Sequence, residues 1–178
     1  MILTSDLTLY HPLWEKADDL LCTKDAIGLF DRLVDVYLLA CAIGVKEDKC
    51  INDIENPLSN PKSIGRSTID HQKNLNVRDI LDNLLQNILI SSNTIDFEID
   101  ERLKLAFDPD YNSKKLTAAN LLTSFANYGI EQIFNNIDSN SPLVVIDQLH
   151  NYFESLTLSN YDEILNNLTL EELKNSIK

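Results

Sequence analysis

Apolar residues recur along most of the chain at the three- and four-residue spacing of an amphipathic helix. The pattern is clearest over residues 25–43, 76–92 and 97–107, and over a helix that starts at Ser113 or Thr117 and ends at Ile137. Each of these stretches is long enough for a helix that buries one face. In the stretch from Phe97 to Phe107, we expect the buried face to hold Ile99, Leu103, Ala106 and Phe107.

The two ends of the chain add shorter elements. Residues 13–21 predict a short first helix, and residues 2–10 partly alternate in the manner of a strand. Ser141 and Pro142 are typical of a helix start, and two short helices are expected after that helix. The pattern therefore predicts an all-α fold in which residues 1–178 form a single helical domain of several helices, with a short N-terminal strand or hairpin.

Two glycines stand at informative places in the predicted helices. Gly44 follows the apolar run of the 25–43 helix, and we expect it to end that helix in a left-handed conformation. Gly129 lies inside the 117–137 helix, where glycine costs about 1 kcal/mol relative to alanine. Such a glycine indicates either a close helix crossing or a break.

Residues 46–75 form a long polar loop with the turn signals Asn56-Pro57, Asn60-Pro61 and Gly65. A loop of this length predicts either a plain connector, with a short strand near 63–69, or a binding element. Its candidate partner-binding residues are Gly65, Arg66, Ser67 and Thr68. An arginine beside two hydroxyls suits a carboxylate or phosphate on a partner, and it equally suits pairing with a local acid.

The net charge of −13 changes the picture of possible partners. A chain this acidic repels phosphate, and its basic residues are scattered, so direct binding to nucleic acid or to an anionic membrane is not expected. The charge indicates either solubility alone or a surface that complements a basic partner. Three cysteines and a start without a secretory pattern favour a cytoplasmic protein.

No motif in the chain indicates catalysis. The three histidines are far apart, and the sequence holds no P-loop, nucleophile elbow or dinucleotide fingerprint. We therefore expect no catalytic residues, no cofactor, no cofactor-binding residues and no metal ligands.

Two segments resemble a known group of proteins. Residues 33–46, with the pattern Asp35-Val36, Leu39-Ala40 and Ile43-Gly44, and the segment Phe125–Glu131 are similar to small accessory proteins of bacterial Dnd (DNA phosphorothioation) antiphage systems. The second segment resembles an A-N-G-G-I motif, and Tyr128 stands where that motif has its first glycine. The resemblance covers roughly residues 25–135 and carries no catalytic residue over to this chain.

The resemblance implies a non-enzymatic accessory or scaffold subunit of an antiphage defence complex. Its partner would be a protein, such as a DNA-processing or ATPase subunit, in a hetero-oligomer. The alternative is an acidic DNA mimic or inhibitor that occupies the basic nucleic-acid-binding surface of an enzyme.

Overall fold

The computed structural model describes residues 6–23, 26–70, 77–108, 117–138 and 141–167. These residues form seven α-helices, one π-helical turn and a two-stranded sheet, which confirms the predicted helical fold with its short N-terminal strand. The chain groups into two compact units, residues 1–135 and 136–178. The prediction of a single domain therefore remains a prediction.

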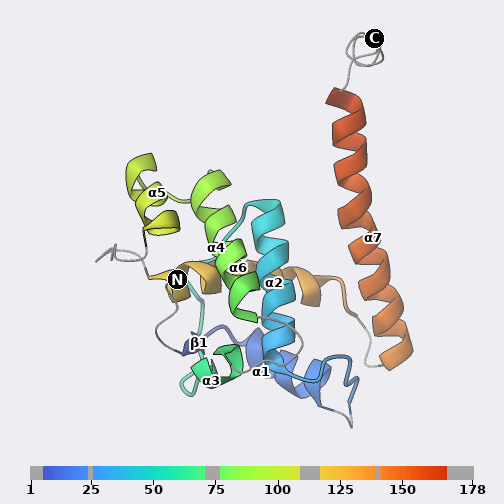
Figure 1. Ribbon diagram of the computed structural model, residues 1–178. Coiled ribbons are helices and arrows are strands. Elements are labelled where there is room, and N and C mark those ends of the chain that lie inside the picture. Colours follow the sequence, from blue (N-terminus) through green and yellow to red (C-terminus); the bar gives the residue numbers. More distant parts are fainter. Residues whose placement is uncertain (1–5, 24–25, 71–76, 109–116, 139–140, 168–178) are drawn as a thin grey trace. The chain divides into compact units, whose positions relative to one another are not determined.

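The first unit holds nearly all the elements (Figure 1). In chain order they are β1 (Leu7–Leu9), α1 (Leu13–Ala17), the π-helical turn η1 (Asp18–Cys22), α2 (Leu33–Glu47), β2 (Lys62–Ile64), α3 (Arg66–Asp70), α4 (Val77–Ser91), α5 (Ile99–Phe107) and α6 (Ala118–Asn135). The predicted helices over 13–21, 76–92 and 117–137 are thus confirmed, with ends that differ by a few residues.

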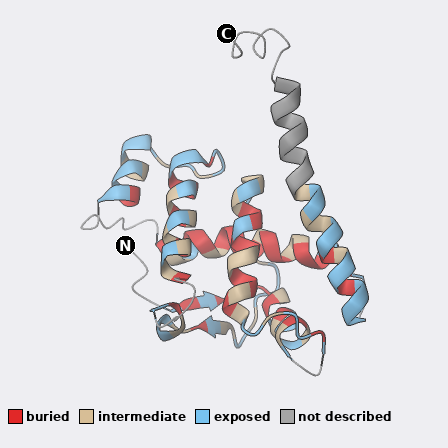
Figure 2. Ribbon diagram, turned by 45° about the vertical axis from the view of Figure 1, so that its right-hand side comes forward, coloured by how far each residue is buried: buried red, intermediate tan, exposed pale blue. Residues whose placement is uncertain are grey.

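The core of this unit is the contact of α2 and α4 with α6, which crosses both of them (Figure 1). The buried residues concentrate where these helices meet (Figure 2). Large side chains with less than 2 % exposure fill this interior, and they include Trp14, Tyr37, Leu81, Ile88, Leu89, Leu122, Phe125, Ile130 and Ile133.

The sheet extends this core at one side. β1 pairs antiparallel with β2, with Leu7 opposite Ile64 and Leu9 opposite Lys62. Leu7 and Leu9 are fully buried, whereas Thr8 between them is exposed. The alternation predicted from the sequence is therefore real, and it turns Thr8 away from the core.

Gly44 and Gly129 lie where α2 and α6 cross. A Cβ added to Gly44 would come within 2.8 Å of the Phe125 carbonyl carbon, and closer still to its oxygen. A Cβ added to Gly129 would come within 2.5 Å of the Ala40 carbonyl carbon. The backbones of the two helices therefore touch, and the predicted close crossing at Gly129 is confirmed.

The predicted bounds of α2 were wrong at both ends. The helix does not stop at Gly44; it continues to Glu47, and Asp48 takes the left-handed conformation with φ of 50°. It starts at Leu33 rather than near residue 25, because Gly28 has a positive φ of 56° and Ile27 and Phe30 donate backbone hydrogen bonds to Leu20 and Leu21. The preceding residues therefore fold as turns against the end of η1.

The predicted buried face of α5 was wrong for three of its four residues, and only Ala106 is buried as expected. Leu105 and Ala106 are buried, while Ile99, Leu103 and Phe107 are 54 %, 42 % and 61 % exposed. The reason lies in Arg102, whose guanidinium donates to the carbonyl oxygens of Leu89 and Ser92 at 2.6 and 2.7 Å. Leu89 lies in the last turn of α4 and Ser92 directly follows the helix, where carbonyls have no partner within the helix. Arg102 binds both and thereby fixes the rotation of α5.

The second unit contains α7 (Pro142–Asn167). Its start matches the prediction from Ser141 and Pro142, but one continuous helix replaces the first of the two short helices expected after it. The second short helix, which a capping box from Thr169 to Glu172 predicts, lies outside the described residues. No helix in the described part of either unit combines the length and the apolar character needed to cross a membrane.

Candidate functional site

A cavity of about 820 Å³, lined by both polar and apolar side chains, opens on the surface of the first unit. Its walls come from β1, from the N-terminal half of α6 and from the segment that follows α2. Small-molecule sites commonly have volumes of roughly 300 to 1,000 Å³, so the cavity is large enough for a ligand. The lining residues are Asp6, Thr8, Tyr10, Ile51, Asn52, Ile54, Thr117, Ala118, Ala119, Asn120, Thr123, Ser124 and Asn127.

The outward face of the β1 strand supplies the first wall. Asp6, Thr8 and Tyr10 alternate with the buried Leu7 and Leu9, so their side chains share the face that the core does not use. Tyr10 is 47 % exposed. This wall thus presents a carboxylate, a hydroxyl and a phenol at spacings that the strand geometry fixes.

The first turns of α6 supply the second wall. The Thr117 hydroxyl accepts a hydrogen bond from the Asn120 backbone N–H at 3.2 Å, which is the geometry of an N-cap. Asn120 and Thr123 follow at helical spacing. The Thr123 hydroxyl is already paired with the Tyr37 hydroxyl at 3.2 Å. Of the polar residues on this wall, Asn120 is therefore the one with a wholly uncommitted amide among the described contacts.

Hydrogen bonds join the cavity residue Asn127 to Trp14 and to Ile51. Asn127, only 3 % exposed, accepts a 2.9 Å hydrogen bond from the Trp14 indole and donates to the Ile51 carbonyl at 3.5 Å. The Ile51 N–H in turn donates to the Ser124 carbonyl at 2.9 Å. The bonds to Asn127 and to Ser124 are both made by the backbone of Ile51, so they hold the start of the 51–54 segment against α6.

The predicted partner-binding residues lie beside this cavity rather than in it. Gly65 links β2 to α3, and Arg66, Ser67 and Thr68 form the first turn of α3. The Arg66 N–H donates to the Asp6 carboxylate at 2.8 Å, which connects the predicted cluster to the cavity wall. The role of these four residues in partner binding stays a prediction.

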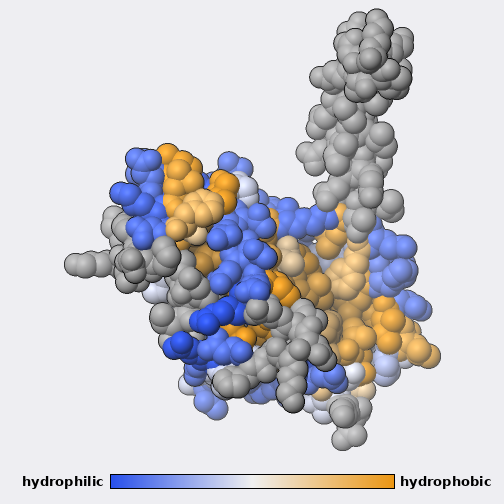
Figure 3. All heavy atoms as spheres, in the orientation of Figure 1, coloured by the Kyte–Doolittle hydropathy of each residue, from blue (hydrophilic) through white to orange (hydrophobic). Residues whose placement is uncertain are grey.

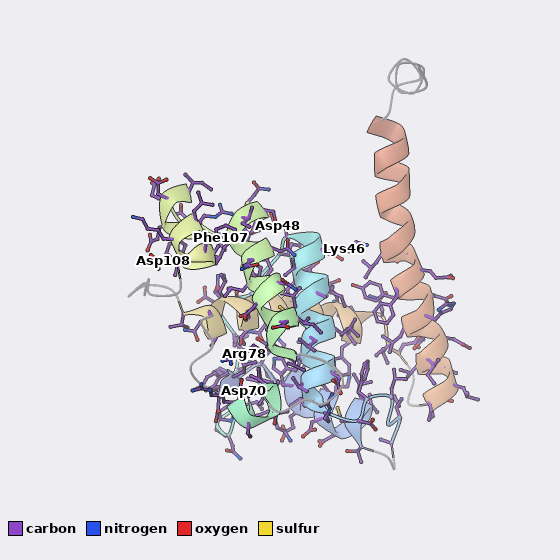
Figure 4. The ribbon with its side chains drawn as sticks, in the orientation of Figure 1. Lys46, Asp48, Asp70, Arg78, Phe107 and Asp108 are labelled. Atoms are coloured by element: carbon purple, nitrogen blue, oxygen red, sulfur yellow. The ribbon has the colours of Figure 1, made fainter. Side chains whose placement is uncertain are left out.

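The side chain of Arg66 already has an acidic neighbour. Its guanidinium donates to Asp70 at 3.2 Å, one helical turn later, and Arg78 of α4 reaches the same carboxylate at 3.4 Å (Figure 4). Of the two readings of the cluster, local pairing is therefore present in the fold. The predicted strand near 63–69 is real only over Lys62–Ile64, because residues 66–70 are helical.

The cysteines do not form a reactive site. Burial raises the pKa of the Cys41 thiol to about 12, and burial with the nearby carboxylates of Asp18 and Asp35 raises the pKa of Cys22 to about 11. Burial is also the main cause of the raised pKa of Cys50. Thiolates are the nucleophilic form, and at neutral pH all three side chains are overwhelmingly thiols.

No group of three His, Cys, Asp or Glu side chains capable of holding a metal occurs in the described ranges.

The sequence pattern had not indicated the cavity residues Asp6, Thr8 and Asn120. The one signal for them was the alternation around Thr8, which marks an outward position but not what stands opposite. The convergence of three segments distant in sequence left no local pattern.

Comparisons with protein-family models, with curated proteins and with solved structures found no match to this chain.

Proposed function

We propose that the chain is a non-enzymatic accessory subunit of a bacterial antiphage defence complex, and that it binds its partner protein through the exposed apolar face of α5. That face, formed by Ile99, Leu103 and Phe107, carries the proposal. The three residues follow one another at four-residue spacing, so they form a stripe on one side of the helix. Exposed contiguous apolar surface is typical of protein interaction sites.

The apolar stripe of α5 is exposed on the surface of the first unit. Apolar atoms gather over α5, at the upper left of the first unit (Figure 3), and Phe107 lies at the end of the helix (Figure 4). Because Arg102 anchors α5 through the carbonyls of α4, the stripe stands on a fixed element of the unit. A prepositioned apolar surface loses less conformational entropy on binding than a loop would.

The charges around the stripe favour a basic partner. Residues 96–108 hold the acids Asp96, Glu98, Asp100, Glu101 and Asp108, against the two bases Arg102 and Lys104. Two copies of a chain with a net charge of −13 repel one another, which disfavours self-association. An apolar patch rimmed with lysine and arginine on a different protein, such as a DNA-processing or ATPase subunit, complements both features.

The resemblance to Dnd-associated proteins supports the proposed role in a defence complex, and it does not bear on which surface binds the partner. Its two motif glycines both lie at the crossing of α2 and α6, where Gly44 faces the backbone of Phe125 and Gly129 faces that of Ala40. Those motifs therefore describe how two helices pack, and they are consistent with the absence of catalytic residues from the resemblance. The defence role itself rests on this resemblance.

Purification from a bacterial host that carries the surrounding genes tests the proposal. We expect the tagged wild-type chain to elute as a complex whose second component is a DNA-processing or ATPase subunit. A triple variant, Ile99→Gln with Leu103→Gln and Phe107→Gln, should elute alone while keeping the wild-type circular dichroism and melting temperature. Leu29→Gln, which alters an apolar residue of 38 % exposure elsewhere, is the matched control and should retain the partner.

The outcomes separate the two functional hypotheses. A wild-type chain that elutes alone, or a triple variant that keeps its partner, contradicts the proposed role of α5. A complex that resists the triple substitution but dissociates with salt and with added duplex DNA favours the DNA-mimic alternative, because that mode of binding depends on charge.

A further inference from the structure

The cavity between β1 and α6 has an electrostatic character of its own. Among the described residues that line it, Asp6 is the only charged one, and none is a lysine, arginine or histidine. A carboxylate without a compensating base favours cations and repels anions. The net charge of the whole chain, −13, adds to the same field. Phosphate and carboxylate ligands are therefore disfavoured in this cavity.

The uncommitted polar groups of the cavity can accept hydrogen bonds. Within the described part of the chain, the side chains of Thr8, Tyr10 and Asn120 make no hydrogen bond. Asp6 uses one carboxylate oxygen for the Arg66 N–H, and its other oxygen has no partner among the described residues. The hydroxyls of Thr8 and Tyr10 and the amide of Asn120 can also donate, whereas the Asp6 carboxylate only accepts. Ammonium and guanidinium groups are donors only, so the preference for them over a ligand rich in acceptors comes from Asp6.

The rest of the lining suits the carbon chain of such a cation. Ile51, Ile54, Ala118 and Ala119 contribute apolar surface, and alkyl stems of amines pack against such surface while the charged end finds polar partners. The half-exposed ring of Tyr10 adds an aromatic group, and aromatic faces attract organic cations.

We propose that this cavity binds an alkylammonium or guanidinium group, with its charge at Asp6 and its alkyl stem against the 51–54 segment and the first turn of α6. Two sources supply this chemistry: a free polyamine, and a lysine or arginine side chain of a bound protein. The inference does not depend on the accessory role, because the isolated full-length chain is sufficient to test it.

Calorimetric titration of the full-length protein provides the test. The probes are spermidine, an end-blocked peptide that contains lysine and arginine, and the same peptide with acetyl-lysine and citrulline in their place. Inorganic phosphate is the anionic probe. We expect the cationic probes to bind and the neutral peptide and phosphate not to bind. Binding of spermidine alone identifies a small-molecule ligand, and binding of the basic peptide alone identifies a partner side chain.

Three variants place the binding in the cavity. Asp6→Asn removes the charge and keeps an oxygen for the Arg66 N–H, and it should weaken cation binding about tenfold or more. Thr8→Trp adds bulk at an outward strand position and should abolish binding with an unchanged melting temperature. Asp31→Asn, which makes the same change in net charge at an exposed residue outside the cavity, should bind as the wild type does.

Several results would overturn the proposal. They are the absence of cation binding at millimolar concentration, equal binding of phosphate, and binding that survives both Asp6→Asn and Thr8→Trp. An equal loss in Asp6→Asn and Asp31→Asn would also overturn it, because the affinity would then come from diffuse surface charge.

Discussion

The contact of α2 with α6 and the contact of α4 with α5 both bury apolar residues of a helix, but they do so to different extents. At the first, Gly44 and Gly129 let two backbones touch, and large residues such as Phe125 and Ile130 are fully buried around them. At the second, the shorter α5 buries Leu105 and Ala106 and leaves three large apolar residues exposed. Both α5 and α6 carry an apolar stripe, but only the stripe of α6 is wholly buried.

The difference shows what decides the rotation of a helix. In α6, the apolar stripe and the polar contacts agree, because Asn127 and Glu131 reach Trp14 and His11 on the same packed side. In α5, the polar contact of Arg102 with the end of α4 overrides part of the apolar stripe. Uncovered carbonyls at a helix end are costly to leave unpaired, and one arginine satisfies two of them.

The largest expected effect is at the helix crossing. Gly129→Ala gains about 1 kcal/mol of helix propensity, but the new Cβ overlaps the Ala40 carbonyl, so we expect a net loss of about 3 kcal/mol or more in the free energy of unfolding. Gly65→Ala is the control, because a Cβ there meets only the Ser67 hydroxyl at 3.6 Å. Urea denaturation measures both variants. A Gly129→Ala protein as stable as the wild type would mean that the backbones do not touch.

A matched pair of leucines tests the face of α5. Leu105→Ala should cost about 2 to 4 kcal/mol, because Leu105 is only 5 % exposed. Leu103→Ala, at 42 % exposure, should cost less than about 1 kcal/mol. Thermal melts followed by circular dichroism compare the two. The opposite order would show that α5 packs through the stripe predicted from the sequence.

A smaller effect is expected at the rim of the crossing. The Tyr128 hydroxyl donates to the Glu47 carboxylate at 2.6 Å, and Lys49 lies 5.4 Å from the centre of the Tyr128 ring. Tyr128→Phe should therefore lower the free energy of unfolding by about 1 kcal/mol. Glu47→Gln in the Tyr128→Phe background should add little, whereas in the wild-type background it should be destabilising. Additive losses from urea denaturation would contradict this coupling.

The smallest effect is expected at Asp48, which links the end of α2 to the segment between α4 and α5. Asp48 ends α2, and its carboxylate accepts from the Asn93 N–H at 2.8 Å in the link between α4 and α5. Burial alone would raise the pKa of Asp48, but the hydrogen bonds from residues 92–94 outweigh it and lower the pKa. A lowered pKa in the folded state means that the contribution of the charge is present above the ordinary pKa of aspartate and is lost as the pH falls through the folded value.

Asp48→Asn isolates that charge, since asparagine also accepts the left-handed conformation. We expect a loss of less than about 1 kcal/mol at pH 7, which shrinks when the same urea titration is made near pH 3. A difference that stays constant between the two pH values would assign the effect to geometry instead of charge.

The sequence by itself determined the elements that repeat apolar residues over several turns. The helices over 77–91 and 118–135 and the strand at Leu7–Leu9 were all readable, because periodic burial is a local property of the chain. Gly129 was recognisable as a close helix crossing or a break, and the structure shows that it is a crossing. The ends of α2 were not readable, because Gly28 and Asp48 take left-handed conformations that the apolar periodicity does not mark. Asp48 also accepts a hydrogen bond from the distant Asn93.

Only the tertiary structure decided which faces are covered and where a site forms. The rotation of α5 follows from Arg102 reaching the carbonyls of α4, and the cavity exists because β1, the 51–54 segment and α6 come together around Asn127. Hydrogen bonds between distant segments have no period along the chain. Which groups pair in these hydrogen bonds depends on the whole fold. The exposed face of α5 and the cavity could therefore not be predicted from residue spacing.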